Sequence, residues 1–223
     1  METESGQPIT LAMMRDVFYS AVVCDALDSA GYPRQSPRVP WRPLTTQGVL
    51  IGRAKTTLWA EMAHPDPQPY ELELQAVDSC RPDDVFIAAA AGSMRSGLWG
   101  ELLSTAARRG GCVGALVDGA VRDVEKMRRM QFPIWARGTC IYDSRDRNRV
   151  IDVDVPVEID GVRIAPGDLV VADVDGVVAF PASSAPSVLA AAESRFEDEE
   201  RLMQRLEQGS TTVELLGLEE AGT

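Results

Sequence analysis

The sequence predicts an α/β protein built as one domain around a mixed β-sheet, with a long C-terminal helix. Between residues 84 and 137, apolar runs alternate with helical stretches, which is typical of parallel strands joined by helices. From residue 150 to 181, short β-rich runs are broken by Asp-Gly and Pro-Gly-Asp, which predicts hairpins. The chain has 223 residues, of which 45% are hydrophobic, so it can bury one sizeable core.

The N-terminal part predicts a tail, a helix and a proline-rich segment. Residues 1–8 and 218–223 are expected to be flexible tails of the single domain 1–223. A helix is expected from Ile9 into VVCDALDSAG, with Ser20 as a candidate N-cap and Gly31 as its stop. The following YPRQSPRVPWRP contains too much proline for regular structure.

Strands and helices are then expected to alternate up to the C-terminal helix. GVLIGRAKTTLWA predicts a strand with a glycine bulge or bend, and a short helix is expected around Leu72 to Val77. The centre predicts strand 84–90, helix 98–110, strand 112–118, helix 120–130 and strand 132–137. The last helix is expected from about Pro186 to Gln208, before Gly209.

The charge balance argues against polyanionic partners. The net charge is -12, with 34 acidic and 22 basic residues, so the chain repels nucleic acid and anionic membranes. The N-terminus lacks a basic start and an apolar segment, and no apolar run is long enough to span a bilayer. We therefore expect a soluble, cytoplasmic protein without nucleic-acid or membrane partners.

Several common catalytic arrangements lack their residues in this chain. The sole histidine, His64, lies among prolines, which excludes histidine metal clusters and makes a Ser-His-Asp triad a poor hypothesis. Lys55 and Lys126 are the lysines available for an imine, and neither has the apolar surroundings of a nucleophile. The cysteines occur singly, without a Cys-x-x-Cys pair. Carboxylates and arginines therefore remain as the candidate catalytic groups.

A first candidate site follows the strand that ends at Asp118. A turn at Gly119 would place Arg122 and Asp123 in the first turn of the next helix, at the carboxyl edge of the sheet, where ligands usually bind. Arginine matches a carboxylate, and aspartate is a hard oxygen ligand for Mg²⁺ or Mn²⁺. Alternatively, Asp118 caps the helix and Arg122 pairs with Asp123 or Glu125. Spacing alone leaves both interpretations open.

A second candidate element is the start of the preceding helix. Glu101 begins this helix, and the N–H groups of Leu102 and Leu103 lack partners within it. Such an end attracts an anion. If both helix starts meet in one crevice, a 2-oxo acid can be held there by its carboxylate, with a cation beside its carbonyl.

These same residues carry a family resemblance. WGELLSTAARRGGCVGALVDGAVRDVEKMRRMQFPIWARGT, together with PGDLVVADVDGVVAFP, closely resembles the RraA-like family (regulator of ribonuclease activity A), which includes class II 4-hydroxy-4-methyl-2-oxoglutarate aldolases. The likeness also covers VVCDALDSAG and the charged last helix. It implies a ββα sandwich of swivelling-domain type, assembled as a homotrimer or a dimer of trimers with active sites between subunits.

The resemblance also implies roles for single residues. Asp123 would contact Mg²⁺ or Mn²⁺, Arg122 would bind pyruvate and its enolate, and Glu101 would order metal-bound water. The backbone around Gly100, Leu102 and Leu103 would receive the pyruvyl carboxylate. An acid from the neighbouring subunit's last helix would complete the outer shell of the metal. We place this acid at Glu199, with Glu200 as a close rival.

The implied reaction is that of a metal-dependent class II aldolase, a carbon–carbon lyase. It would cleave a 4-hydroxy-2-oxo di- or tricarboxylate to pyruvate through an enolate, with oxaloacetate decarboxylation as a side activity. The loops CIYDSRDRNRV and HPDPQPY depart from the family pattern and could line the distal half of the substrate site. Two alternatives stay open: a protein that inhibits an RNA-degrading enzyme by contact, and another metal-dependent lyase or hydratase.

Overall fold

The computed structural model describes residues 10–11, 13–14, 18–45 and 48–215. Both predicted tails and Ile9, where the first predicted helix begins, lie outside the described residues. The helices are α2 (Ser20–Ser29), α3 (Glu71–Asp78), α4 (Glu101–Arg109), α5 (Val124–Arg129), α6 (Ala185–Glu207) and α7 (Thr212–Leu215), with the 3₁₀ helix η1 (Ala182–Ser184). The strands are β1 (Arg42–Pro43), β2 (Leu50–Glu61), β3 (Asp84–Gly97), β4 (Gly114–Val121), β5 (Ile134–Thr139), β6 (Asn148–Val153), β7 (Val157–Ile159), β8 (Val162–Ile164), β9 (Leu169–Ala172) and β10 (Val177–Phe180).

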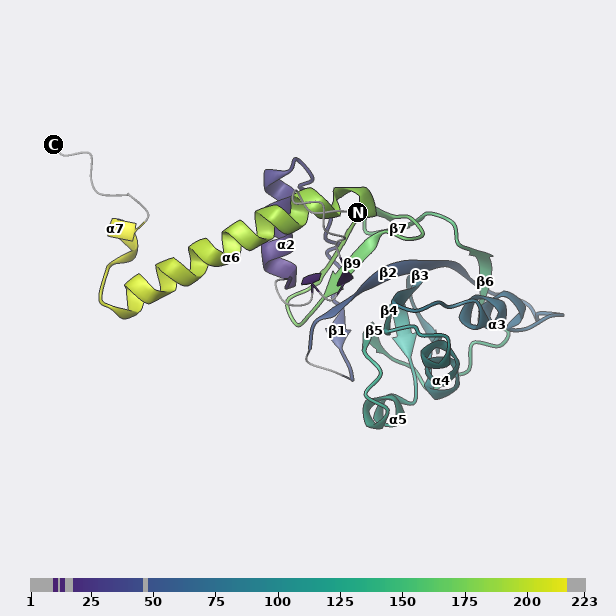
Figure 1. The fold of residues 1–223 in the computed structure, drawn as a ribbon. Coiled ribbons are helices and arrows are strands. Elements are labelled where there is room, and N and C mark those ends of the chain that lie inside the picture. Colours follow the sequence, from purple (N-terminus) through teal and green to yellow (C-terminus); the bar gives the residue numbers. More distant parts are fainter. Residues whose placement is uncertain (1–9, 12, 15–17, 46–47, 216–223) are drawn as a thin grey trace.

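One mixed eight-stranded sheet organises the described residues (Figure 1). Its order is β1-β5-β4-β3-β2-β9-β10, and β6 pairs with β2. Strands β2, β3, β4 and β5 run parallel, joined by α3, α4 and α5. The predicted α/β class and its central alternation are therefore confirmed. The carboxyl ends of β3, β4 and β5 meet at one edge of the sheet.

The two faces of this sheet bury different partners because side chains alternate along each strand. Phe86 and Ala88 of β3 pack with α3, α4 and α5 on one face, in a cluster that includes Trp99 and Phe132. Ile87, between them, packs on the other face with the apolar side chains of the β7–β8 hairpin. Helices α3, α4 and α5 are thereby held beside the carboxyl edge of the parallel strands.

The C-terminal third is antiparallel, as predicted. β9 pairs with β10 and with β2, and β7 pairs with β8 across the Asp160-Gly161 turn. The predicted last helix is α6, and its first two turns pack against α2. Figure 1 shows the rest of α6 running away from the body of the molecule, on the side away from α4 and α5.

Several local predictions were wrong. β3 continues to Gly97 rather than ending at residue 90. β4 does not end at Asp118 but continues through Gly119 to Val121, because a Cβ at Gly119 would lie 2.6 Å from the Ser93 carbonyl oxygen and glycine lets the strands approach. The irregularity in β2 lies between Leu58 and Trp59, not at a glycine. Ser20 does not cap α2.

Ser20 is instead the first residue of α2, and Tyr19 is the N-cap. The backbone N–H and the hydroxyl of Ser20 both donate hydrogen bonds to Asp173, at 2.7 Å each. This carboxylate holds the start of α2 against the β9–β10 turn. Gly31 follows the helix with φ +84°, which confirms it as the stop. Among the helices of the described ranges, none combines the length and apolar character needed to cross a membrane.

Candidate functional site

Three chain segments converge at the carboxyl edge of the parallel strands. The segment between β3 and α4 is bonded to the end of β4: Leu98 N–H donates to the Ala120 carbonyl at 2.8 Å, and Arg122 N–H donates to the Trp99 carbonyl at 2.9 Å. The loop after β5 joins them, because Gly97 N–H donates to the Tyr142 carbonyl at 2.8 Å. The starts of α4 and α5 are thus fixed beside each other.

Asp123 lies between these two helix starts. It is the N-cap residue of α5, with φ 58°, a left-handed conformation that aspartate tolerates better than most residues. Its side chain does not cap α5 but reaches α4, where its Oδ2 accepts a hydrogen bond of 3.3 Å from Glu101 N–H. A Cβ at Gly100 would lie 2.8 Å from the same oxygen, so glycine is needed for this approach.

A pocket of about 250 Å³ opens here. Its wall includes five of the predicted site residues: Gly100, Leu102, Leu103, Arg122 and Asp123. The structure therefore brings the start of α4 together with the arginine and the aspartate. Glu101 lies at the same helix start, where its carboxylate pairs with Lys126 of α5 at 2.8 Å.

The predicted helix start at residue 120 was four residues early, because α5 begins at Val124. Arg122 and Asp123 precede α5 rather than forming its first turn. The two alternative pairings of these residues are also wrong. Asp118 does not cap α5: it is buried in β4, where Arg137 Nε donates to it at 2.6 Å. Arg122 pairs with neither Asp123 nor Glu125 but with Asp143, at 2.7 Å.

Four polar residues of the wall were not singled out by the sequence: Tyr70, Glu73, Asp143 and Ser144. Three of them belong to the two loops expected to line the distal half of the substrate site, and both loops contribute to the pocket wall. Glu73 was missed because a glutamate in a short helix gives no signal of its own. The pattern ELELQAV offered only a weak signal: if one face of this helix is buried, one of its two glutamates must be buried with it.

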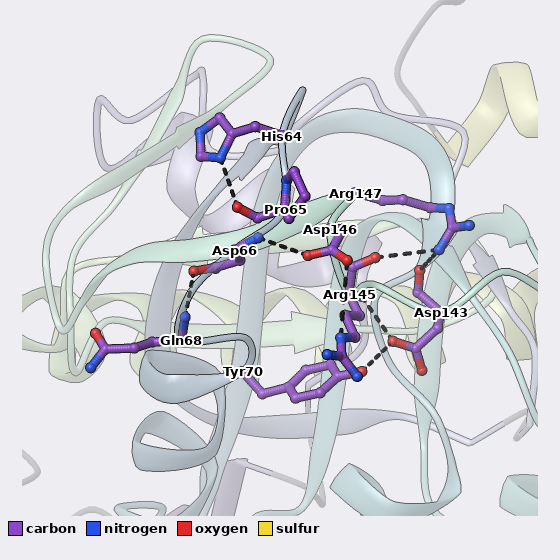
Figure 2. A network of polar contacts seen from close by, with 9 residues as sticks. All are labelled: His64, Pro65, Asp66, Gln68, Tyr70, Asp143, Arg145, Asp146 and Arg147. Carbon is purple, nitrogen blue, oxygen red and sulfur yellow. Dashed lines mark hydrogen bonds and ion pairs between the residues drawn. The ribbon is translucent and has the colours of Figure 1, made fainter.

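Figure 2 shows how the two loops are tied together. Tyr70 donates its hydroxyl proton to Asp143 Oδ1 at 2.5 Å, and Asp66 N–H donates to Asp146 Oδ1 at 2.7 Å. Arg147 donates to the Asp143 carbonyl oxygen at 3.1 Å. Asp143 therefore connects Tyr70, which precedes α3, to Arg122, which precedes α5.

The pKa values in this wall diverge. Burial raises the pKa of Asp143, but hydrogen bonds from Tyr70, Arg145 N–H and Arg122 outweigh it, so the net shift is downward. Burial, followed by the hydrogen bond to Asp143, raises the pKa of Tyr70 to about 12. Burial, followed by the charge of Asp143, raises the pKa of Glu73 to about 8. Two neighbouring carboxyl groups are thus driven to opposite protonation states near neutral pH.

Other candidate residues lie elsewhere. Glu199 is on α6, where its carboxylate accepts hydrogen bonds from Tyr19 at 2.7 Å and Arg195 at 2.9 Å. It lines a surface hollow with Glu200, not the pocket of Asp123. His64 is an exposed loop residue, as expected. Lys55 is buried and pairs with Asp154 at 2.7 Å, away from the pocket wall.

The residues at the α4 start suit a hard divalent cation. Within the described ranges, no group of three histidine, cysteine or acidic residues could enclose a metal ion. Asp123 nevertheless offers a carboxylate oxygen at the start of α4, where Gly100 leaves room for it, and Glu101 begins the same helix with its carboxylate paired to Lys126. Mg²⁺ binds through one or two carboxylates and keeps several waters, so this donor set fits it.

A family model described as Aldolase/RraA matches residues 20–179, which include this entire pocket. The chain belongs to the RraA-like family. A relative from Halalkalibacterium halodurans, named "Putative 4-hydroxy-4-methyl-2-oxoglutarate aldolase", is 33% identical over 159 residues, which is 71% of this chain and 72% of the relative.

Two solved structures agree with this RraA-like assignment. Streptomyces coelicolor RraAS2, described as an unusual member of the RNase ES inhibitor RraA protein family, matches with a TM-score of 0.76 and 31% identity, covering 88% of this chain and 97% of that one. An uncharacterized protein from Pseudomonas syringae matches with a TM-score of 0.82 and 25% identity over 96% of both chains. The predicted RraA-like fold is confirmed, and relatives bear names of both aldolases and inhibitors.

Proposed function

We propose that this protein is a divalent-metal-dependent lyase that cleaves a 4-hydroxy-2-oxo di- or tricarboxylate and releases pyruvate. One observation carries the proposal: the carboxylate of Asp123 lies against the start of α4, in the same pocket as the guanidinium of Arg122. This arrangement supplies a cation ligand, anion-binding amides and a positive group within one small cavity. The aldolase names of relatives support the same reaction class.

The first step is binding of the substrate carboxylate. The N–H groups of Leu102 and Leu103 belong to the first turn of α4 and have no partners within the helix. They can donate hydrogen bonds to an anion, which the positive end of the helix dipole also attracts. Leu102 is 80% exposed, so this end of the helix is open to a ligand. The aliphatic side chains then cover the methylene carbon of the substrate.

The second step is stabilisation of the enolate. Asp123 would hold Mg²⁺ or Mn²⁺ directly and Glu101 through water, and the bound cation would polarise the 2-oxo group. Arg122 stabilises the negative charge where it develops on the enolate oxygen. Its pair with Asp143 uses one terminal nitrogen, Nη2, and a guanidinium carries five N–H donors, so others remain for the substrate. Asp143 orients the guanidinium before substrate arrives.

The third part of the proposal concerns assembly. We expect a homotrimer or a dimer of trimers in which Glu199 of a neighbouring subunit reaches the metal's outer shell. The exposed outer half of α6 supports this, because its buried side chains end at Ala192 while the helix continues to Glu207.

The test is a pyruvate-release assay on purified protein. A panel of 4-hydroxy-2-oxo acids, including 4-hydroxy-4-methyl-2-oxoglutarate, is supplied with Mg²⁺ or Mn²⁺, and oxaloacetate is included for the side activity. We expect pyruvate from at least one substrate and loss of release on addition of a chelator. Release that survives the chelator would contradict the metal role.

A second candidate function is inhibition of an RNA-degrading enzyme by protein contact. It is favoured by the similarity to Streptomyces coelicolor RraAS2, which is described as a member of an RNase-inhibitor family. Inhibition of an RNase by this chain that is equally strong in Asp123→Ala would support it. A chain that is inactive on the whole panel but inhibits the RNase would replace the lyase proposal. Another metal-dependent lyase or hydratase would instead consume a panel member without forming pyruvate.

A further inference from the structure

Glu73 is a buried acid whose position the steps above do not use. It lies in the first turn of α3 and is only 6% exposed, whereas Glu71 on the same helix is exposed. It lines the same pocket as Arg122 and Asp123. Burying a carboxyl group is unfavourable unless it is well paired, so its presence in the wall calls for a reason.

Within the ranges that the structure describes, Glu73 forms no ion pair. Its carboxyl group is hydrogen-bonded by the Ser144 hydroxyl, and Asp143 and Arg122 are its charged neighbours. Arg122, however, forms its ion pair with Asp143, at 2.7 Å. The carboxyl of Glu73 therefore belongs to the pocket wall beside an ionised acid, and the neutral hydroxyl of Ser144 is its hydrogen-bond partner. This arrangement leaves it free to exchange a proton with a bound molecule.

The proposed cleavage requires two proton movements at neighbouring atoms. The hydroxyl on C4 must lose its proton as the C3–C4 bond breaks, and C3 of the resulting enolate must gain one. The oxygen on C4 and the carbon C3 are both bonded to C4, so one carboxyl group can reach both. A single acid-base residue in the wall is thus sufficient for both movements.

Building on the proposed function, we propose that Glu73 is the proton-transfer residue of this site. Its carboxylate takes the proton of the C4 hydroxyl while the O–H electron pair forms the new C4 carbonyl. The C3–C4 electron pair passes to the enolate, and Glu73 then returns the same proton to C3, which gives the methyl group of pyruvate. Glu73 ends in its starting state, and no other reactant is consumed.

The electrostatics of the wall suit this role. Burial and the charge of Asp143 raise the pKa of Glu73 to about 8, so its carboxylate is a stronger base than an exposed glutamate. A base works best when its pKa lies near the working pH. The neighbouring groups are Ser144 and Asp143 from the loop after β5, Arg122 from the loop after β4, and Tyr70 before α3, whose pKa the charge of Glu73 raises. Ser144 and Arg122 lower the pKa of Glu73 and Asp143 raises it.

The main test is the pH dependence of kcat/KM for Glu73→Gln, with Glu71→Gln as the matched control on the same helix. Wild type and the control should gain activity with rising pH up to an apparent pKa well above 4.5, the ordinary value for glutamate, and near 8. Glu73→Gln should lose kcat by on the order of 10² to 10⁴ with KM little changed, and should lose that inflection. Glu73→Asp should restore part of both.

If Glu73→Gln folds poorly, a second variant tests the same role of Glu73. Ser144→Ala removes the hydrogen bond that lowers the pKa of Glu73, so the inflection should move to higher pH. Exchange of pyruvate methyl protons in D₂O, followed by NMR, should occur in wild type and be lost in Glu73→Gln, because this exchange uses the C3 proton transfer alone.

The possible failures are separable. A wild type that releases pyruvate together with a folded Glu73→Gln variant that keeps the wild-type pH profile and methyl exchange would overturn the role of Glu73 and leave the lyase intact. An unmoved inflection in Ser144→Ala would also count against it. A wild type that neither releases pyruvate nor exchanges its methyl protons would overturn the lyase proposal and the proton-transfer role together.

Discussion

At the scale of single residues, binding of the enolate requires the planar set of N–H donors on the Arg122 guanidinium. Arg122→Lys keeps the charge but replaces a planar fork by a point charge, which costs about 1.5–3 kcal/mol at such a site. We expect kcat/KM to fall roughly ten- to a hundredfold. Arg128→Lys on exposed α5 is the control. A kcat/KM for Arg122→Lys equal to wild type would place the guanidinium outside the reaction.

The raised pKa of Glu73 also predicts a pH dependence of stability. Between 4.5 and about 8, the folded chain holds this proton and the unfolded chain does not. The folded state therefore binds more protons in this window, and the free energy of unfolding falls as pH rises through it. Thermal melts from about pH 5 to about pH 9 should decline less steeply for Glu73→Gln than for wild type or Glu71→Gln. Parallel declines would mean that Glu73 is ionised at neutral pH.

At the scale of secondary-structure elements, the start of α4 depends on a glycine. Gly100 has extended backbone angles that any residue adopts, so alanine there is not strained. Its Cβ would nevertheless lie 2.8 Å from Asp123 Oδ2 and 3.3 Å from Arg122 Cγ. Gly100→Ala should displace this carboxylate and weaken Mn²⁺ binding by about 10- to 100-fold, as other changes around metal ligands do.

Gly176→Ala is the matched control for that prediction, because a Cβ at Gly176 meets open space. Mn²⁺ titrations of both variants, read by calorimetry, check it. Equal Mn²⁺ affinity in Gly100→Ala and wild type would show that the carboxylate has room to move or that the cation binds elsewhere.

The elements themselves were largely predictable. The parallel strands and their helices are long apolar and amphipathic segments, and their period identifies them. The end of β4 was not predictable, because Asp118-Gly119 has the composition of a turn. Only its neighbours explain it: Arg137 pairs with Asp118, and Ser93 lies against Gly119. A buried ion pair and a close strand contact are tertiary features that leave no local pattern.

About half of the candidate site could be predicted from the sequence. The Arg122 and Asp123 wall follows from strand-to-helix junctions, which sequence spacing locates. The rest of the polar wall combines Tyr70 and Glu73 with Asp143, which lies about 70 positions further along the chain. Such a pairing depends on which loops the sheet order brings together, and the family resemblance did not supply it because these loops depart from its pattern.

At the scale of the whole molecule, the proposed trimer predicts complementation between variants. Asp123→Ala damages one side of each site, and Glu199→Gln damages the part that a neighbouring subunit supplies. In trimers reassembled from an equal mixture, about a quarter of the sites would receive both intact residues. The mixture should therefore be more active than either variant alone. Activity that never exceeds the average of the two would place each site within one chain, and Glu200→Gln tests the rival position.

The central claim is that Asp123, Arg122 and the α4 amides form one site for a 2-oxo acid and its cation. Calorimetric titration of pyruvate with and without Mn²⁺ tests it most directly, with Glu125→Gln as an exposed control near Asp123. We expect pyruvate to bind wild type and the control only when Mn²⁺ is present, and not to bind Asp123→Ala. Pyruvate that binds equally well without Mn²⁺ and to Asp123→Ala would contradict the claim.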